Sequence, residues 1–103
     1  MSRIVSKKLR DSARGQDCTL RIPGVCNFNP ETTVLAHLPC GHKGMGMKSP
    51  DNMAVFACSC CHDRLDFRVK GGDIDAGDLL RALAETQAAW LRMGLMTIKG
   101  VAA

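Results

Sequence analysis

Possible metal chemistry is concentrated in one short stretch of the sequence, ACSCCHDRLD at residues 57 to 66. Cys58 and Cys61 form a C-x-x-C pair, the spacing that lets two thiolates approach one tetrahedral ion from a tight turn. Cys18 and Cys26 form a looser pair, with seven residues between them that include RIPG, which can fold the loop back. Together the two pairs predict a zinc site that contributes directly to the free energy of folding.

The same cysteines are also compatible with disulfides or with haem. The opening MSRIVSKKLR has no apolar run of signal-peptide length, so we expect a cytoplasmic protein whose thiols stay reduced, which disfavours disulfides. Residues 58 to 62 match C-x-x-C-H, the attachment signature of c-type haem. Haem attachment normally takes place outside the cytoplasm and leaves Cys18 and Cys26 without a role, so we expect no haem. We expect Cys60 to point away from the metal, and Cys40 can be a free thiol.

Two of the three histidines can do chemistry of their own. If a helix begins near the second cysteine pair, His62 and Asp66 lie four residues apart on one face, where they can share a divalent ion distinct from the zinc. The alternative is that His62 hydrogen-bonds near the thiolates and Asp66 faces water. His37, near the end of a predicted strand, can act as a general base that takes a proton from water. By itself it is also consistent with an ordinary half-buried histidine.

Short β-branched and apolar runs predict two strands. The first covers TTVLAHL at residues 32 to 38, and the second covers MAVFAC at residues 53 to 58. Glycine, proline and lysine are frequent in residues 39 to 52 between them, which favours a long loop. CHDRLDFRV at residues 61 to 69 can begin a helix that the following glycine pair stops.

A longer amphipathic helix is predicted after Asp75, whose side chain can cap the first turn, and Gly94 supplies the terminator. Between these residues apolar positions recur near helical spacing, at Leu79, Leu80, Leu83, Ala84, Trp90 and Leu91. We expect this helix to cover the open side of the small sheet, with Trp90 as its large anchor.

The net charge is +4, and the first 21 residues carry the surplus. They hold six basic side chains against Asp11 and Asp17, whereas the rest of the chain balances at eight against eight. Such a segment suits a nucleic-acid backbone, although a solvated, frayed terminus has the same composition. The 103 residues fit one small domain, so we expect a basic arm over residues 1 to 17 and a single zinc-bound domain over residues 18 to 103. No run of about 18 apolar residues is present, so no membrane contact is expected.

His37 and His62 form a recognisable pattern together with Asn52, which precedes the second predicted strand. His37, Asn52 and His62 follow the order strand, loop, strand, helix. In this order, and in the stretch PDNMAVFACSCCHD, the sequence resembles the HNH endonuclease family, whose ββα-metal motif runs histidine, asparagine, histidine. CTLRIPGVCNFNPETTVLAHL together with ACSCCHD resembles more closely the small prophage-encoded YbcO family, to which nuclease activity is ascribed. This likeness covers roughly residues 8 to 95.

The resemblance implies an α+β fold, a small zinc-stapled ββα-metal (HNH or His-Me finger) domain with an added C-terminal amphipathic helix. It implies a metal-dependent DNA endonuclease of phage or prophage origin, acting in the cytoplasm of the bacterial host cell. In such an enzyme His37 is the general base, Asn52 orients His37 or the loop, and His62 is a ligand of a catalytic Mg²⁺ or similar divalent ion. A distant kinship to the phage Ref nuclease implies a phage or host recombination protein as a further partner.

One position departs from the family pattern. In many HNH enzymes the residue before the base is a metal-binding Asp or His, and here that residue is Ala36. Either Asp66 or Asp63 then completes the metal site, or the site is weak. If His37 instead matches the metal-binding histidine of the family, Leu38 takes the base position and the chain binds DNA without cutting it. The alternative function is therefore a non-catalytic zinc module that binds nucleic acid or acts as a recombination accessory.

Overall fold

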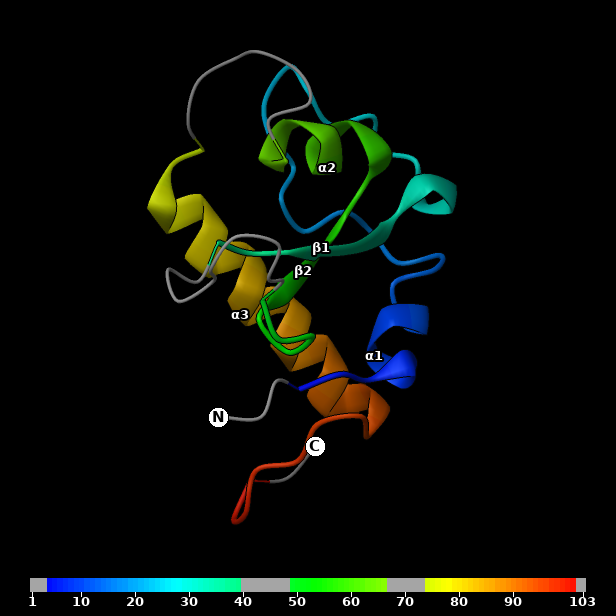
Figure 1. Ribbon diagram of the computed structural model, residues 1–103, viewed down its shortest axis with the longest axis vertical. Coiled ribbons are helices and arrows are strands. Elements are labelled where there is room, and N and C mark those ends of the chain that lie inside the picture. Colours follow the sequence, from blue (N-terminus) through cyan, green and yellow to red (C-terminus); the bar gives the residue numbers. More distant parts are fainter. Residues whose placement is uncertain (1–3, 40–48, 67–73, 102–103) are drawn as a thin grey trace.

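The computed structural model describes residues 4–39, 49–66 and 74–101 (Figure 1). The helices and strands and their bounds are α1 (Lys7–Asp11), the short 3₁₀ helix η1 (Pro30–Thr32), β1 (Val34–His37), β2 (Ala54–Ala57), α2 (Ser59–Leu65) and α3 (Ala76–Met93). Both predicted strands and both predicted helices are present, so the α+β class is confirmed. No helix in the described ranges has the length and apolar character needed to span a membrane.

β1 and β2 form an antiparallel hairpin whose two faces contact different parts of the chain. Leu35 lies opposite Phe56, and His37 lies opposite Ala54. Because side chains alternate along a strand, these four side chains share one face. Ala36, which is fully buried, points from the other face. The side chain of His37 therefore points from the opposite face of the hairpin to that of Ala36.

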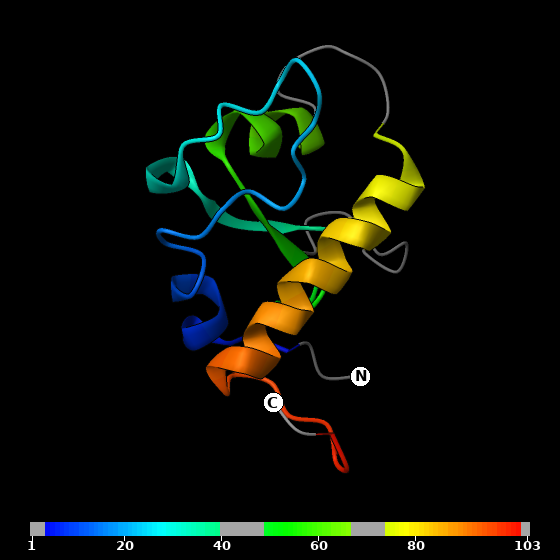
Figure 2. The same ribbon diagram turned by 180° about the vertical axis from the view of Figure 1, so that it is seen from behind.

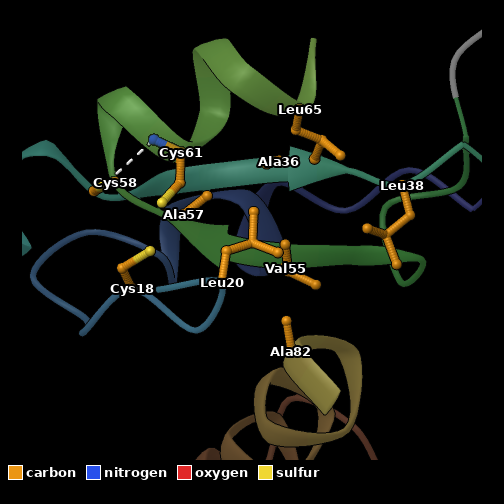
Figure 3. Close-up of a cluster of buried hydrophobic side chains, with 10 residues drawn as sticks. All are labelled: Cys18, Leu20, Ala36, Leu38, Val55, Ala57, Cys58, Cys61, Leu65 and Ala82. Carbon is orange, nitrogen blue, oxygen red and sulfur yellow. Dashed lines mark hydrogen bonds between the residues drawn. The ribbon is translucent and has the colours of Figure 1, made fainter. Parts of the chain in front are cut away.

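The face that carries Ala36 packs under α2. Figure 3 shows Ala36, Val55 and Ala57 of the hairpin close to Cys61 and Leu65 of α2, all within one buried cluster. Residues four apart lie on the same side of a helix, so this short helix buries one apolar stripe against the hairpin. Tertiary packing holds α2 in place, since a helix of this length is marginal alone.

α2 begins at Ser59, two residues before the predicted start, because the thiol of Cys58 acts as the helix cap. The sulfur of Cys58 accepts a hydrogen bond from the N–H of Cys61 at 3.4 Å. The helix ends at Leu65, and residues 67–69, which the sequence pattern also assigned to it, lie outside the described residues.

The C-terminal half of α3 covers the opposite face of the hairpin, as predicted. At the start of the helix, Asp75 accepts a hydrogen bond from the N–H of Gly77 at 2.7 Å, and Gly94 ends the helix with a left-handed φ of 74°. Trp90 is fully buried and meets Phe56 edge to face, with ring centroids 6.0 Å apart. Such a pair contributes about 0.5–1.5 kcal/mol beyond the area that it buries.

Part of the predicted basic arm folds as α1 and joins this second cluster. Leu9 of α1 and the following Ala13 are buried with Leu35 and Trp90. The indole Nε1 of Trp90 donates to the hydroxyl of Ser12 at 2.8 Å, which fixes this segment beside α3 (Figure 2). The sequence pattern did not reveal this helix because its charged positions outnumber the buried ones.

Candidate metal centre and histidine site

The cysteines predicted as zinc ligands converge beside the start of α2, and Figure 3 shows three of them, Cys18, Cys58 and Cys61. The sulfur atoms of Cys18, Cys26, Cys58 and Cys61 all lie within 4.8 Å of one another. The sulfurs of Cys26 and Cys58 are 3.8 Å apart. Sulfurs at about 2.3 Å from one tetrahedral zinc ion are about 3.8 Å from each other, so the cluster has the size of such a site. All four residues are free thiols in the structure.

Backbone N–H groups point at the sulfurs of the first cysteine pair. The N–H of Arg21 donates to Cys18 with an N···S distance of 3.4 Å, and the N–H of Phe28 donates to Cys26 at the same distance. Arg21 and Phe28 adopt left-handed φ values of 45° and 54°, which cost a non-glycine residue about 1–2 kcal/mol. This strained backbone directs donors at sulfur, and a donor favours the thiolate, the form that binds metal.

Crowding shifts the pKa values of these thiols in opposite directions. The hydrogen bond from Cys61 lowers the pKa of Cys18 to about 4, against the effect of burial and with help from the N–H of Arg21. Burial raises the pKa of Cys26 to about 11. The hydrogen bond between Cys61 and Cys18 raises the pKa of Cys61 above its usual range. The thiols therefore do not ionise together on their own, whereas a bound divalent cation favours the thiolate form of each.

An ion-pair network ties the loop that carries the first cysteine pair to α3. The guanidinium of Arg21 makes two hydrogen bonds of 2.8 Å to the carboxylate of Glu85. Arg81 donates to Glu85 at 2.9 Å and also to the carbonyl groups of Thr19 and Leu20. The hydrogen bond from Arg21, followed by that from Arg81, lowers the pKa of Glu85 to about 2 although partial burial opposes this shift. α3 thus helps to position the metal-ligand loop.

A second group of polar side chains surrounds His37 at the end of β1. Its Nε2 lies 2.7 Å from Oδ1 of Asp51, a residue only 6% exposed. The other carboxylate oxygen accepts from the N–H of Ser6 at 2.6 Å and lies 3.4 Å from Nε of Arg10. The N–H of Asp51 donates to the carbonyl of Ile4 at 2.9 Å. The chain just before α1 and the turn before β2 therefore meet at the histidine.

The environment of Asp51 determines the protonation of this pair. Burial acts to raise the pKa of the carboxyl, but hydrogen bonds from His37 and Ser6 and the charge of Arg10 hold it below its usual range. The carboxylate is therefore ionised at neutral pH and can only accept, so Nε2 of His37 carries the shared proton. The free lone pair of the neutral ring is then at Nδ1, which can take a proton from water.

His62 and Asp66 form a separate pair on one face of α2, as predicted. Nε2 of His62 lies 3.0 Å from Oδ2 of Asp66. Neighbouring ligands of an octahedral Mg²⁺ at about 2.1 Å are also about 3.0 Å apart, so this spacing suits either a hydrogen bond or two ligands of one ion. In the described ranges, the cysteine cluster is the one group of three or more metal-ligating side chains.

No hydrogen bond links the predicted set of His37, Asn52 and His62 within the described residues. No hydrogen bond or ion pair within them joins His37 to His62, and α2 packs on the Ala36 face, from which His37 points away. The carbonyl of Asn52 accepts from the side chain of Gln87 of α3 at 3.0 Å. Its side-chain oxygen is buried and has no partner among the described residues.

Comparison with known proteins places these features in a family. Residues 7–95 match the family model described as "Putative nuclease YbcO". The chain belongs to the YbcO family. Relatives from Escherichia coli K12 and from Enterobacteria phage 82 carry the same description, and each is 50% identical over 93 residues, covering 85% of this chain and 95% of the relative.

A solved structure, titled a putative bacteriophage protein from Escherichia coli K-12, has a fold similar to that of this YbcO-family chain. It is 46% identical to this chain, with a TM-score of 0.64, and the match covers 84% of this chain and 100% of that one. The family match spans the four cysteines and both histidine pairs. The family description names a nuclease, which indicates nucleic acid as the substrate class.

Asp51 is the residue of the site that sequence reasoning missed. It stands directly before Asn52, which the motif order favoured, and the sequence alone does not show that its carboxylate turns back to His37. A carboxylate in the turn that faces a strand-end histidine is the signal that could have identified it. The expectation that Cys60 points away from the metal agrees with its exposure, whereas Cys40 lies outside the described residues.

Proposed function

We propose that this YbcO-family protein is a metal-dependent DNA endonuclease of the HNH type, with His37 as the general base. The observation that carries the proposal is the 2.7 Å contact between Nε2 of His37 and the buried carboxylate of Asp51. This contact leaves Nδ1 as the proton acceptor and stabilises the imidazolium that forms when the proton arrives. Family membership supports the phosphodiester as the bond that is cut.

In the proposed reaction a water molecule attacks phosphorus while Nδ1 of His37 takes its proton, and the bond to the 3′ oxygen breaks. Asp51 holds the ring in one tautomer throughout. Asn52 positions the turn that carries Asp51, because its carbonyl is tied to α3 through Gln87. His62 and Asp66 would hold a Mg²⁺ or similar ion, which would supply positive charge to offset the charge that develops on the phosphate and the leaving oxygen.

The cysteine cluster has a structural role in this proposal. Zinc bound by Cys18, Cys26, Cys58 and Cys61 joins the first loop to the start of α2, two segments that are far apart in sequence. Because a preformed site rarely exists in an unfolded chain, the binding free energy of the ion stabilises the fold. The hairpin that carries His37 is then supported by the zinc-bound α2 on one side and by α3 on the other.

The proposal is tested by incubating purified protein with plasmid and with single-stranded DNA in Mg²⁺, Mn²⁺ or EDTA. We expect cleavage that requires added ion and falls by about 100-fold or more in His37→Ala. In His62→Ala we expect a higher concentration of ion to be needed. Zinc content and circular dichroism of the same samples establish that the variants are folded. Cleavage in EDTA, or unchanged cleavage by His37→Ala, contradicts the proposal.

One observation favours a second candidate, a non-catalytic zinc module that binds nucleic acid or a recombination protein. His37 points away from the α2 face, whereas a base and an ion that act on one phosphate must approach it together. In this alternative both histidine pairs are structural. It predicts DNA binding without cleavage in any ion, and a DNA affinity that His37→Ala leaves unchanged.

A further inference from the structure

A pocket of about 260 Å³ opens beside His37, between the start of β1 and residues 6–14, which comprise α1 with its N-cap and the turn after it and are called the α1 segment below. Its lining includes Arg10, Asp11, Arg14 and Thr33 as well as the histidine. The volume is below the roughly 300–1,000 Å³ of sites that enclose a drug-sized molecule, so the pocket suits one chemical group of a larger ligand.

Two hydrogen-bond donors at this pocket have no partner among the described residues. The guanidinium of Arg14 makes no hydrogen bond or ion pair with any other described residue. Thr33 is only 3% exposed, and its hydroxyl has no partner in the described part of the chain. A buried hydroxyl without a partner is destabilising, so an acceptor placed in the pocket offsets this loss.

The charge at the pocket also favours an anion. Arg10 directs its Nε toward Asp51 at 3.4 Å and the carbonyl of Ser6 at 3.5 Å, which leaves its terminal amino groups without a partner among the described residues. The carboxylate of Asp11, which would repel an anion, is paired with Lys7 at 2.5 Å. The pocket therefore contains the guanidinium groups of Arg10 and Arg14 and one carboxylate, that of Asp11, whose charge is balanced by Lys7.

The arginine-bearing segment is held in place rather than free to swing. Leu9 and Ala13 are buried on the hairpin, and the hydroxyl of Ser12 accepts from the indole of Trp90 at 2.8 Å. These contacts fall on either side of Arg10 and just before Arg14. Preorganised donors bind with a smaller loss of conformational entropy than donors on a mobile arm.

We propose that Arg10, Arg14 and Thr33 form a subsite that binds one phosphodiester group of the nucleic-acid backbone beside His37. The subsite rests on the proposed function in that it assigns a substrate-positioning role within the same site. Guanidinium groups bind phosphate oxygens in a planar, two-pronged geometry, and the threonine hydroxyl donates to a third oxygen. The α1 segment is then part of the substrate site and not a diffuse electrostatic arm.

The test uses dimethyl phosphate, a monoanionic phosphodiester, titrated into ¹⁵N-labelled protein. In the wild type we expect the resonances of the Thr33 amide and the Arg14 side chain to shift along one saturable curve. Arg14→Ala should abolish the shift at Thr33, and Arg14→Lys should weaken binding because the planar fork is lost. Lys8→Ala is the matched control, since it removes a positive charge of the same N-terminal segment outside the pocket and should leave the shift intact.

A second readout uses a short DNA duplex. Arg14→Ala should raise its Kd about tenfold and reduce the slope of log K against log salt by about 1, as expected for one lost phosphate contact. A wild type without shifts at the pocket, or an Arg14→Ala variant that binds dimethyl phosphate like the wild type, overturns the subsite. Shifts and weakened DNA binding in a protein that cleaves no DNA support the subsite and overturn the proposed nuclease function alone.

Discussion

His37 differs from an ordinary half-buried histidine in the partner that it has. A buried carboxylate that also accepts from Ser6 cannot turn away from the ring without losing several hydrogen bonds. The orientation and the tautomer of His37 are therefore fixed before any substrate binds. The α1 segment contributes to this arrangement, because Ser6 and Arg10 both contact Asp51.

The substitution Asp51→Asn tests this positioning role. The introduced side-chain amide would still offer an oxygen to Ser6, but its NH₂ group can also donate, so His37 can adopt the other tautomer, in which Nδ1 is protonated. We expect Asp51→Asn to lower the rate of DNA cleavage at least about tenfold and the free energy of unfolding by about 1–3 kcal/mol. The measurement is a nicking time course together with urea unfolding.

Asp78→Asn is the matched control for this substitution. It removes the same charge from an exposed carboxylate of α3 that lies outside the pocket beside His37. Cleavage by Asp51→Asn at the rate of Asp78→Asn would exclude a positioning role for Asp51.

The cysteine cluster could be predicted from the sequence, whereas the partner of His37 could not. The C-x-x-C pair of Cys58 and Cys61 forms its geometry within one helical turn, so spacing alone reveals it. The contact between His37 and Asp51 joins positions 14 residues apart, and its identity depends on the path of the intervening chain. The spacing of residues along the sequence does not reveal the path of the intervening chain.

At the scale of elements, the cysteine cluster and α2 support each other. Cys61 is fully buried, contributes to the cysteine cluster and packs on the hairpin, whereas the adjacent Cys60 is exposed. We expect Cys61→Ser to lose bound zinc and to unfold in large part at 37 °C, because the metal contributes to folding. Cys60→Ser should keep the metal and change the free energy of unfolding by no more than about 0.5 kcal/mol.

Metal content by mass spectrometry and thermal unfolding with and without chelator test this prediction. The wild type should contain one zinc ion per chain and lose thermal stability with a chelator. A Cys61→Ser protein that retains the metal and the wild-type unfolding temperature would show that the cluster is not a zinc site.

Elements with strong local patterns were predicted well. α3 begins after Asp75 and ends at Gly94 because the cap and the terminator act within one turn. Both predicted strands extend one or two residues beyond each end of the observed strands, since strand ends depend on pairing. α1 was missed because its stability comes from two buried residues and a contact with Trp90, which a charged sequence does not reveal.

At the scale of the whole molecule, the hairpin separates two buried clusters and α3 contributes to both of them. Ala82 joins the cluster that contains the cysteines, and Trp90 joins the cluster beneath α1. Glu85 lies between these positions and binds Arg21 of the first cysteine loop. The stability of the metal region and that of the histidine region are therefore connected through one helix.

Acid should weaken the contribution of Glu85. Its pKa is about 2 in the folded chain against an ordinary value of 4.5, so the folded state binds fewer protons. The ion pair stabilises the fold fully above about pH 4.5, and its contribution is lost as the pH falls toward 2. The side chain is 37% exposed, so solvent screening reduces the effect.

Urea unfolding of wild type and Glu85→Gln at pH 6 and pH 4 measures this contribution. We expect the difference in unfolding free energy between them to be smaller at pH 4. Glu31→Gln, at an exposed site without an ion pair among the described residues, is the control and should give the same difference at both pH values. A constant difference for Glu85→Gln would mean that its ion pairs do not affect stability.

The most direct test of the central claim, that His37 is a general base for phosphodiester hydrolysis, is nicking of supercoiled plasmid by His37→Ala with and without added imidazole. With Mg²⁺ present, the variant should remain folded and zinc-loaded, cleave about 100-fold or more slowly than the wild type, and recover part of this rate as imidazole is added. Nicking by His37→Ala at the wild-type rate would contradict the claim.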